Sequence, residues 1–124
     1  MKTLIILPTF NEASNITSIL RQLHEQYPEI DILHIDDNSP DGTAEIALEF
    51  GLESYRQIRN FNKLGLGSAY KQGFRWALDK NYEVVITMDS DGSHKIAQIA
   101  DFLKMSADYD LIIGTRWMAN GEVI

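Results

Sequence analysis

The sequence predicts an α/β domain built on a mainly parallel β-sheet that is covered by helices on both faces. Short apolar runs rich in β-branched residues alternate along the chain with segments of helical periodicity. A helical segment separates most successive runs, an order that favours right-handed crossovers between parallel strands. With 124 residues, 44% of them hydrophobic, the chain has the size of one domain, which we expect to span residues 1–124.

The strands are predicted from apolar runs that end at turn-forming residues. The first run begins at Thr3 and is bounded by Pro8, and the second leads into the turn-rich segment Asp36–Gly42. The third run is weaker, and the fourth reads as a buried strand. The expected strands are 3–7, 30–35, 52–58, 84–88 and 111–114.

The helices are predicted from apolar residues that recur with a period of about 3.6 residues. Ser14 or Asn15 can cap the first helix, and Pro28 ends it. The loop 60–67 precedes the third helix. The expected inward faces are Ile16, Ile19, Leu20, Leu23 and Tyr27; Ile46, Ala47 and Phe50; Ala69, Tyr70, Gly73, Phe74 and Ala77; and Ile96, Ile99, Ala100 and Leu103.

Composition narrows the classes of function. The formal charge of -7 disfavours a broad basic surface for nucleic acid or anionic lipid. Because cysteine is absent, a disulfide framework and a thiolate metal site are excluded. The apolar run that Pro8 ends is too short for a signal-peptide core or a membrane span, and no later run is longer. We therefore expect a cytoplasmic protein.

Polar residues follow several of the predicted strands. In a parallel sheet, ligands bind beyond the carboxyl ends of the strands, so residues just after each strand share one edge. Three of the four groups on this edge are acidic. The groups are Pro8–Glu12, Asp36–Asn38, Asp89–Asp91 and Thr115–Arg116.

Asp89 and Asp91 follow the buried fourth strand directly. They offer hard oxygen ligands, which suit Mg²⁺ or Mn²⁺ rather than zinc. Magnesium takes few protein carboxylates and completes its shell with water and substrate phosphate, so this pair points to a phosphorylated ligand. The alternative is structural: Asp89 as a helix cap and Asp91 as a solvated turn residue. A second acidic group on the same edge favours the metal.

Other polar residues on the edge also have two interpretations, one structural and one in ligand binding. Asp37 either turns the chain or contacts a ribose hydroxyl or base edge, and Asp41 already supplies the cap that a structural role would need. Arg116 either forms a surface salt bridge or steadies a phosphate. The loop Gly65–Gly67 lacks the residues of a P-loop, so helix packing explains it better than phosphate binding.

The three histidines give weaker signals. His24 lies on a helix outside its apolar stripe, and His34 lies within a strand, where a hydrogen-bonded structural role is expected. His94 is three residues after Asp91, so a metal or acceptor role is an alternative there. No soft ligand accompanies it.

Together these motifs resemble glycosyltransferase family 2, within it the dolichol-phosphate and polyprenyl-phosphate mannosyltransferases. The resemblance runs from about residue 3 to residue 117, and five blocks in order are more specific than any one of them. The blocks are Pro8–Glu12, Asp36–Thr43, Lys63–Tyr70, Met88–His94 and Gly114–Arg116.

The resemblance implies a Rossmann-like nucleotide-diphosphosugar transferase fold and a role for each matching residue. Asp91 and Arg116 would be the catalytic residues, and Asp89 and Asp91 would hold Mg²⁺ or Mn²⁺, with Ser93 as a weaker third ligand. The donor, a nucleotide-diphosphate sugar such as GDP-mannose, would be bound by Pro8, Phe10, Glu12, Ile35, Asp37, Asp89, Ser90, Asp91 and Arg116.

The resemblance also implies a reaction. Family members transfer the sugar, often mannose, to the phosphate of a polyprenyl or dolichyl lipid with inversion, at the cytoplasmic face of a membrane. An acceptor that is already an anion needs little help from a general base, so the lack of an obvious catalytic base is no obstacle.

Several departures from the family pattern limit the resemblance. Phe10 stands where relatives often have Tyr, Gly92 replaces an apolar residue, and the Pro usual a few residues later is missing. Relatives continue past Arg116, so we expect a domain truncated on its C-terminal side, with low or no activity as an isolated piece.

Three other functions compete with this one. They are a non-catalytic nucleotide-sugar-binding module, a family 2 transferase with another donor and acceptor, and a dinucleotide-dependent oxidoreductase domain. The first loop lacks the glycines that the oxidoreductase requires.

Overall fold

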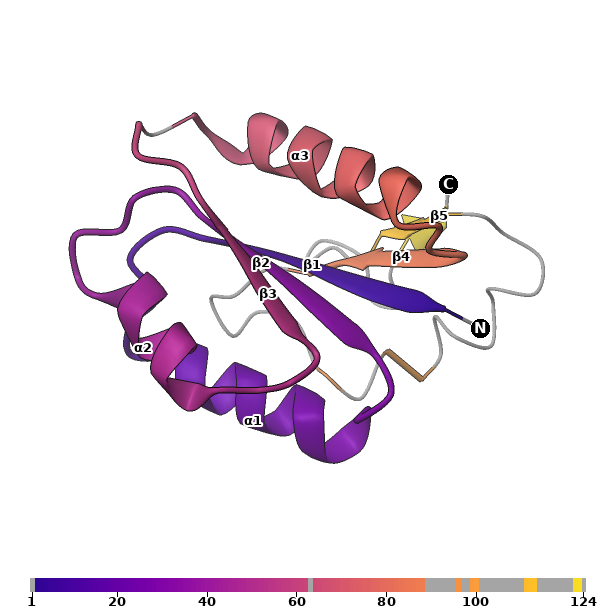
Figure 1. Ribbon diagram of the computed structural model, residues 1–124, viewed down its shortest axis with the longest axis horizontal. Helices are drawn as coiled ribbons and strands as arrows, with labels where there is room; N and C mark the ends of the chain where they lie inside the picture. Colours follow the sequence, from indigo (N-terminus) through magenta and orange to yellow (C-terminus); the bar gives the residue numbers. More distant parts are fainter. Residues whose placement is uncertain are drawn as a thin grey trace.

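A computed structural model describes residues 2–62, 64–88, 96, 99–100, 111–113 and 122–123. Strands and helices alternate through most of this part of the chain, as predicted (Figure 1). The elements are β1 (Thr3–Thr9), α1 (Ile16–Gln26), β2 (Asp31–Asp36), α2 (Thr43–Phe50), β3 (Tyr55–Arg59), α3 (Leu66–Asp79), β4 (Val84–Thr87), β5 (Leu111–Ile113) and β6 (Glu122–Val123).

The strands form one sheet in the order β3-β2-β1-β4-β5-β6. The first five strands of this order pair in parallel, and β6 pairs antiparallel with β5. The predicted mainly parallel sheet is therefore confirmed, with an antiparallel edge strand that the sequence pattern did not indicate. Because β1 lies between β2 and β4, its carboxyl end is flanked by the ends of both neighbours.

Helices cover both faces of the sheet, as predicted. Figure 1 shows α1 and α2 on one face and α3 on the other. Ile5, Leu7 and Ile32 point into the core beneath α1 and α2, whereas Ile6 and Leu33 point into the core beneath α3. All seven residues of β1 are buried, which is typical of a parallel strand enclosed by helices.

Gly73 permits the close approach of α3 to β1. A Cβ atom at this position would lie 2.6 Å from Cδ1 of Ile6, and Ile6 is fully buried. Because a packed core gives little room for Ile6 to move, any larger side chain at position 73 would force α3 away from the sheet. This contact fixes the position of α3, whose first turn borders the site described below.

Pro8 lies inside β1 and does not end it. The Thr9 carbonyl accepts from Asp37 on the β2 side, and the Ile6 carbonyl accepts from Met88 on the β4 side. Backbone groups alternate sides along a parallel strand, so the N–H that Pro8 lacks would have faced β4. Pairing with β4 stops at Ile6↔Thr87, while pairing with β2 continues to Thr9. The predicted boundary at residue 7 was therefore wrong for β1 as a whole.

Two other local predictions need correction. Asn15 precedes α1, but its side chain makes no capping hydrogen bond and instead donates to Glu12 Oε2 at 2.9 Å. Of the inward face predicted around residue 100, Ile96 and Ile99 are buried, whereas Ala100 is exposed. Leu103 lies outside the described residues.

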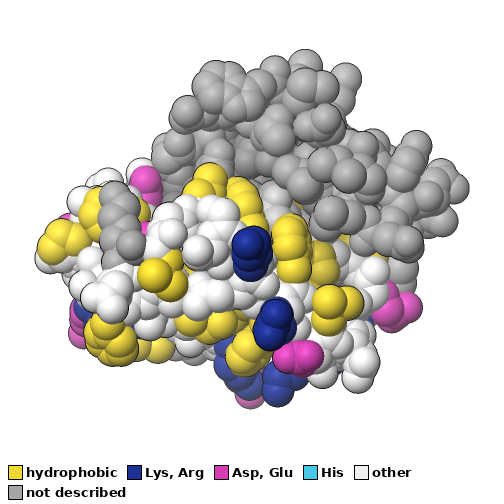
Figure 2. All heavy atoms as spheres, turned by 90° about the horizontal axis from the view of Figure 1, so that it is seen from above, with side chains coloured by type: hydrophobic (Ala, Val, Ile, Leu, Met, Phe, Trp, Pro, Cys, Tyr) yellow, Lys and Arg dark blue, Asp and Glu magenta, His cyan; other side chains and the backbone are white. Residues whose placement is uncertain are grey.

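The outer face of α3 is mixed in character. Lys71 and Arg75 are exposed, and Leu78, one turn after Arg75, is 78% exposed. Figure 2 shows Lys and Arg side chains among hydrophobic ones on this face of the molecule. The charge of the chain is thus unevenly distributed, because residues 61–80 contain four Lys and Arg and one Asp in a sequence of net charge -7.

Candidate functional site

A pocket of about 230 Å³ lies at the carboxyl edge of the sheet, where β1 and β2 end beside the first turn of α3. Its lining is mostly apolar with one carboxylate, a composition typical of small-molecule sites. The lining residues are Pro8, Thr9, Phe10, Ile35, Asp37, Gly65, Leu66 and Ala69.

The structure brings four of the predicted donor-binding residues together in this pocket: Pro8, Phe10, Ile35 and Asp37. Glu12 is not part of the lining. Its backbone carbonyl accepts from the N–H groups of Asn15 and Ile16 and so starts α1, while its own N–H donates to Thr43 Oγ1 at 3.0 Å. Glu12 therefore joins the loop after β1 to the start of α2.

Asp37 both lines the pocket and holds the loop opposite it. The residue is 7% exposed, and its two carboxylate oxygens accept from the backbone N–H groups of Leu64 at 2.9 Å and Gly65 at 3.0 Å. Each oxygen can accept a second hydrogen bond. Asp37 can thus bind a ligand N–H or hydroxyl without releasing the loop.

The loop before α3 was missed as a pocket wall because its position depends on contacts distant in sequence. Asn60 and Gln72 exchange two amide hydrogen bonds of 2.8 and 2.9 Å, which tie the loop to α3. Gly65 has φ +91°, a conformation that favours glycine, and brings the backbone to Asp37. The sequence signal for this wall was the Gly65–Gly67 run, which we had attributed to helix packing.

Asp36 has a structural role and does not face the pocket. Its side chain is fully buried and accepts from Thr9 Oγ1 at 2.7 Å, from the Ser39 N–H at 2.8 Å and from Ser39 Oγ at 2.6 Å. These bonds compensate the loss of hydration of the carboxylate. Asp36 therefore does not contribute to an acidic edge, contrary to the sequence interpretation.

Asp41 is structural, as predicted. Its carboxylate accepts from the Ala13 N–H at 3.0 Å and from the Thr43 N–H at 3.1 Å. Burial acts to raise the pKa of Asp41, but these bonds and the Thr43 hydroxyl outweigh it and lower the pKa. Asp41 thereby connects the loop after β1 to the start of α2.

His34 lies below the pocket in a buried hydrogen-bonded position, which confirms its predicted structural role. Its Nε2 lies 2.7 Å from Thr9 Oγ1, and its Nδ1 lies 2.5 Å from the Tyr55 hydroxyl. Burial lowers the pKa of His34 from 6.5 to about 4, against the opposing effect of the Asp36 charge. The imidazole is therefore neutral near neutral pH.

The predicted metal and phosphate residues lie outside the described part of the chain: Asp89, Ser90, Asp91, Ser93, His94 and Arg116. The strands that precede them are described. Met88 follows β4 and donates its N–H to the Ile6 carbonyl at 3.2 Å, and β5 pairs with β4 on its other side. Both strands run parallel to β1, so their carboxyl ends lie at the same edge as the pocket.

The described residues do not hold a metal site on their own. Within them, no three His, Cys, Asp or Glu side chains gather in a group that could bind a metal ion. The two aspartates after β4 supply hard oxygen donors, which fit Mg²⁺ or Mn²⁺. The metal-site assignment therefore remains a prediction from sequence.

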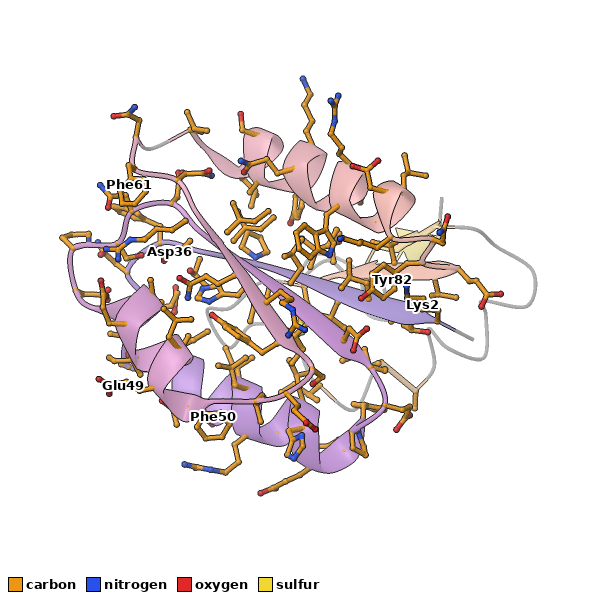
Figure 3. The ribbon with its side chains drawn as sticks, viewed as in Figure 1. Lys2, Asp36, Glu49, Phe50, Phe61 and Tyr82 are labelled. Carbon is orange, nitrogen blue, oxygen red and sulfur yellow. The ribbon has the colours of Figure 1, made fainter. Side chains whose placement is uncertain are left out.

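A second pocket, of about 280 Å³, lies at the opposite edge of the sheet. Lys2, Asp31, Arg56 and Tyr82 are among its lining residues. Figure 3 shows this separation, with Asp36 and Phe61 at one end of the sheet and Lys2 and Tyr82 at the other. Although this pocket is larger, its Asp31 carboxylate already accepts a 2.6 Å hydrogen bond from the Tyr82 hydroxyl. Ligands of parallel sheets bind at the carboxyl edge, so we assign the site to the first pocket.

None of the helices in the described ranges has both the length and the apolar character needed to cross a membrane.

Two solved structures align with this fold. The mannosyltransferase PcManGT from Pyrobaculum calidifontis, solved in complex with GDP-Man and Mn²⁺, aligns with a TM-score of 0.74 and 24% identity over 86% of this chain and 32% of that one. Mannosyl-3-phosphoglycerate synthase from Rubrobacter xylanophilus aligns with a TM-score of 0.60 and 24% identity over 80% of this chain and 33% of that one. These similarities confirm the predicted fold.

Two curated relatives are closer in sequence. Polyprenol monophosphomannose synthase of Mycolicibacterium smegmatis is 40% identical over 126 aligned positions, covering 98% of this chain and 48% of the relative. Undecaprenyl-phosphate mannosyltransferase of Micrococcus luteus is also 40% identical over 126 positions, covering 100% of this chain and 52% of the relative. The chain thus spans about half the length of each. The family 2 glycosyl transferase profile matches residues 4–123, and the chain belongs to glycosyl transferase family 2.

Proposed function

We propose that this chain is the donor-binding part of a polyprenyl-phosphate mannosyltransferase, which takes mannose from GDP-mannose. The carboxyl-edge pocket carries this proposal, because four residues that the family resemblance assigns to the donor line it. The names of the two relatives that are 40% identical support a polyprenyl-phosphate acceptor. The GDP-Man and Mn²⁺ in the solved complex of similar fold support the donor and the metal.

The nucleoside is the part of the donor that the pocket suits. Pro8, Phe10 and Ile35 offer an apolar surface, and Phe10 is 39% exposed, which leaves its ring accessible to a base or ribose. The free acceptor capacity of Asp37 suits a base N–H or a ribose hydroxyl. We therefore place the nucleoside against β1 and β2, with its diphosphate directed toward the end of β4.

The diphosphate would be bound by residues that follow β4 and β5. In this proposal Asp89 and Asp91 hold Mg²⁺ or Mn²⁺, with Ser93 as a third ligand, and Ser90 and Arg116 contact phosphate or sugar. A bound divalent ion neutralises the charge that develops on the departing diphosphate. Asp91 and Arg116 thus act where the glycosidic bond breaks.

The acceptor determines which groups the reaction needs. A polyprenyl phosphate attacks the anomeric carbon with an oxygen that is already anionic, so the chain need not supply a general base. Attack from the face opposite the leaving diphosphate inverts the anomeric centre. Because a polyprenyl lipid resides in a bilayer, we place this domain at the surface of a membrane, on its cytoplasmic side.

A transfer assay tests the proposal. The chain is incubated with radiolabelled GDP-mannose, a polyprenyl phosphate in detergent and Mn²⁺. Because the chain spans about half the length of its relatives, we expect a low yield of mannosyl lipid, which forms only with the metal. Replacing GDP-mannose with UDP-glucose is the matched control for the donor. Calorimetry on the same sample measures donor binding separately. Donor binding without any transfer would leave a nucleotide-sugar-binding module as the function, and no binding of GDP-mannose would contradict the proposal altogether.

A further inference from the structure

A line of hydrogen bonds crosses the sheet below the pocket, from β3 through β2 to β1. Gln57 Nε2 donates to the Tyr55 hydroxyl at 2.7 Å, and the same nitrogen donates to the Ala44 carbonyl at 3.0 Å. Tyr55 contacts His34, His34 contacts Thr9, and the Thr9 hydroxyl donates to Asp36. We call these five side chains, Gln57, Tyr55, His34, Thr9 and Asp36, the relay.

The proton positions in the relay follow from its two ends. The Thr9 hydroxyl has a single proton, which it donates to Asp36, so it must accept from His34 Nε2. His34 therefore carries its proton on Nε2, and its Nδ1 accepts from the Tyr55 hydroxyl. The Tyr55 oxygen in turn accepts from Gln57. Only one tautomer of a neutral His34 satisfies every partner.

The relay continues from Asp36 into the loops that border the pocket. Ser39 donates its N–H and its hydroxyl to Asp36, and Ser39 Oγ accepts from the Asn11 N–H at 2.9 Å. Asn11 has φ +57°, a conformation sparsely populated by residues other than glycine, and this bond helps to hold it. The loops after β1 and β2 are thus joined through Asp36.

Thr9 and Asp37 connect this network to the pocket itself. Thr9 lines the pocket, and its carbonyl accepts from the Asp37 N–H at 3.1 Å. Asp37 follows Asp36 directly and holds the opposite wall through Leu64 and Gly65. A shift of Thr9 would therefore displace both walls of the pocket, the one it lines and the one that Asp37 holds.

We propose that His34 is a positioning residue of the donor pocket, whose Nε2 proton orients Thr9 and thereby fixes Asp36 and the loops after β1 and β2. The proposal rests on the proposed function, because it assumes that the carboxyl-edge pocket binds the donor. His34 is too deeply buried to contact a ligand and acts only through Thr9.

The surroundings of His34 keep the required tautomer. Asp36 is the charged member of the relay, and its charge acts on His34. On the neighbouring elements, Arg59 of β3 and Glu45 of α2 form an ion pair at 2.6 Å. Burial raises the pKa of Tyr55, so Tyr55 remains a hydroxyl that can donate. A second proton on Nδ1 would face this donor and leave one hydrogen bond unmade. The pocket should therefore keep its shape in mild acid.

Calorimetry with GDP-mannose and Mn²⁺ tests the role of His34. We expect His34→Leu to bind about tenfold more weakly than the unaltered chain, because Thr9 loses the donor that orients it. His34→Gln should recover most of this loss, since its amide can donate to Thr9. Ile32→Ala, on the same strand and the same face of the sheet, is the control for lost stability and should bind like the unaltered chain.

The possible outcomes separate this inference from the proposed function. An unaltered chain that binds no GDP-mannose contradicts the proposed function. Binding by the unaltered chain together with equal affinity in His34→Leu, or equal weakening in Ile32→Ala, contradicts the role of His34. Imidazole ¹⁵N chemical shifts test the relay even if His34→Leu does not fold: a proton on Nε2 is expected, and a proton on Nδ1 would overturn the inference.

Discussion

Replacing Asp91 with alanine should weaken Mn²⁺-dependent binding of GDP-mannose by about 100-fold. In the proposed site, Asp91 and Asp89 share the cation that also binds the diphosphate. Removing one carboxylate leaves the metal short of a protein ligand, so most of the metal's contribution to affinity is lost. Calorimetry with GDP-mannose in the presence of Mn²⁺, and again after chelation, measures this contribution directly.

The matched control for Asp91→Ala is Asp79→Ala. Asp79 is an exposed aspartate at the end of α3, and its loss changes the net charge of the chain equally. We expect Asp79→Ala to bind donor normally and both variants to unfold like the unaltered chain. Donor affinity that is the same in Asp91→Ala at equal metal concentration would contradict the metal-site assignment.

Acid should destabilise the fold through His34. Its pKa falls from 6.5 in the unfolded chain to about 4 in the folded one because the imidazole is buried. Below about pH 6.5, His34 becomes protonated in the unfolded state but stays neutral in the folded state, so the free energy of unfolding falls as the pH falls. The loss should reach about 3 kcal/mol near pH 4 and should not grow further below it, where both states are protonated.

Urea unfolding at several pH values between about 7 and 4 measures the pH dependence of the free energy of unfolding. The contribution of His34 is the difference in this dependence between the unaltered chain and a variant without His34. His34→Gln removes the titrating group, so its free energy of unfolding should depend less on pH than that of the unaltered chain. His24→Gln, which replaces an exposed histidine of α1, should keep the full dependence. The same pH dependence in His34→Gln and the unaltered chain would show that His34 is not kept neutral.

Much of the fold was predictable because its signals are local. Apolar runs and helical stripes identified the elements from β1 to β4, and the alternating order indicated a parallel sheet. The end of β1 was not predictable in this way. Whether Pro8 ends a strand depends on which neighbour its missing N–H would have met, and only the register with β2 and β4 answers that.

The candidate site was predictable in part for a similar reason. Residues after parallel strands must share an edge, which brought Pro8, Phe10 and Asp37 into one pocket. The same rule placed both Asp36 and Asp37 on an acidic edge, although Asp36 is buried in the relay and only Asp37, the residue predicted to contact the donor, lines the pocket. Alternation along the strand and partners distant in sequence determine this difference. The wall at Gly65 was missed because Asp37 holds it across 28 residues of sequence.

The central claim is that the carboxyl-edge pocket binds the nucleotide of a metal-bound sugar donor. Paramagnetic broadening by Mn²⁺ in ¹H–¹⁵N spectra tests it most directly. With GDP-mannose present, substoichiometric Mn²⁺ should broaden the amide signals of Phe10, Asp37 and Gly65 and leave those of Ser54 and Tyr82, at the opposite edge, sharp. Broadening centred on Ser54 and Tyr82, or none that depends on the donor, would contradict the claim.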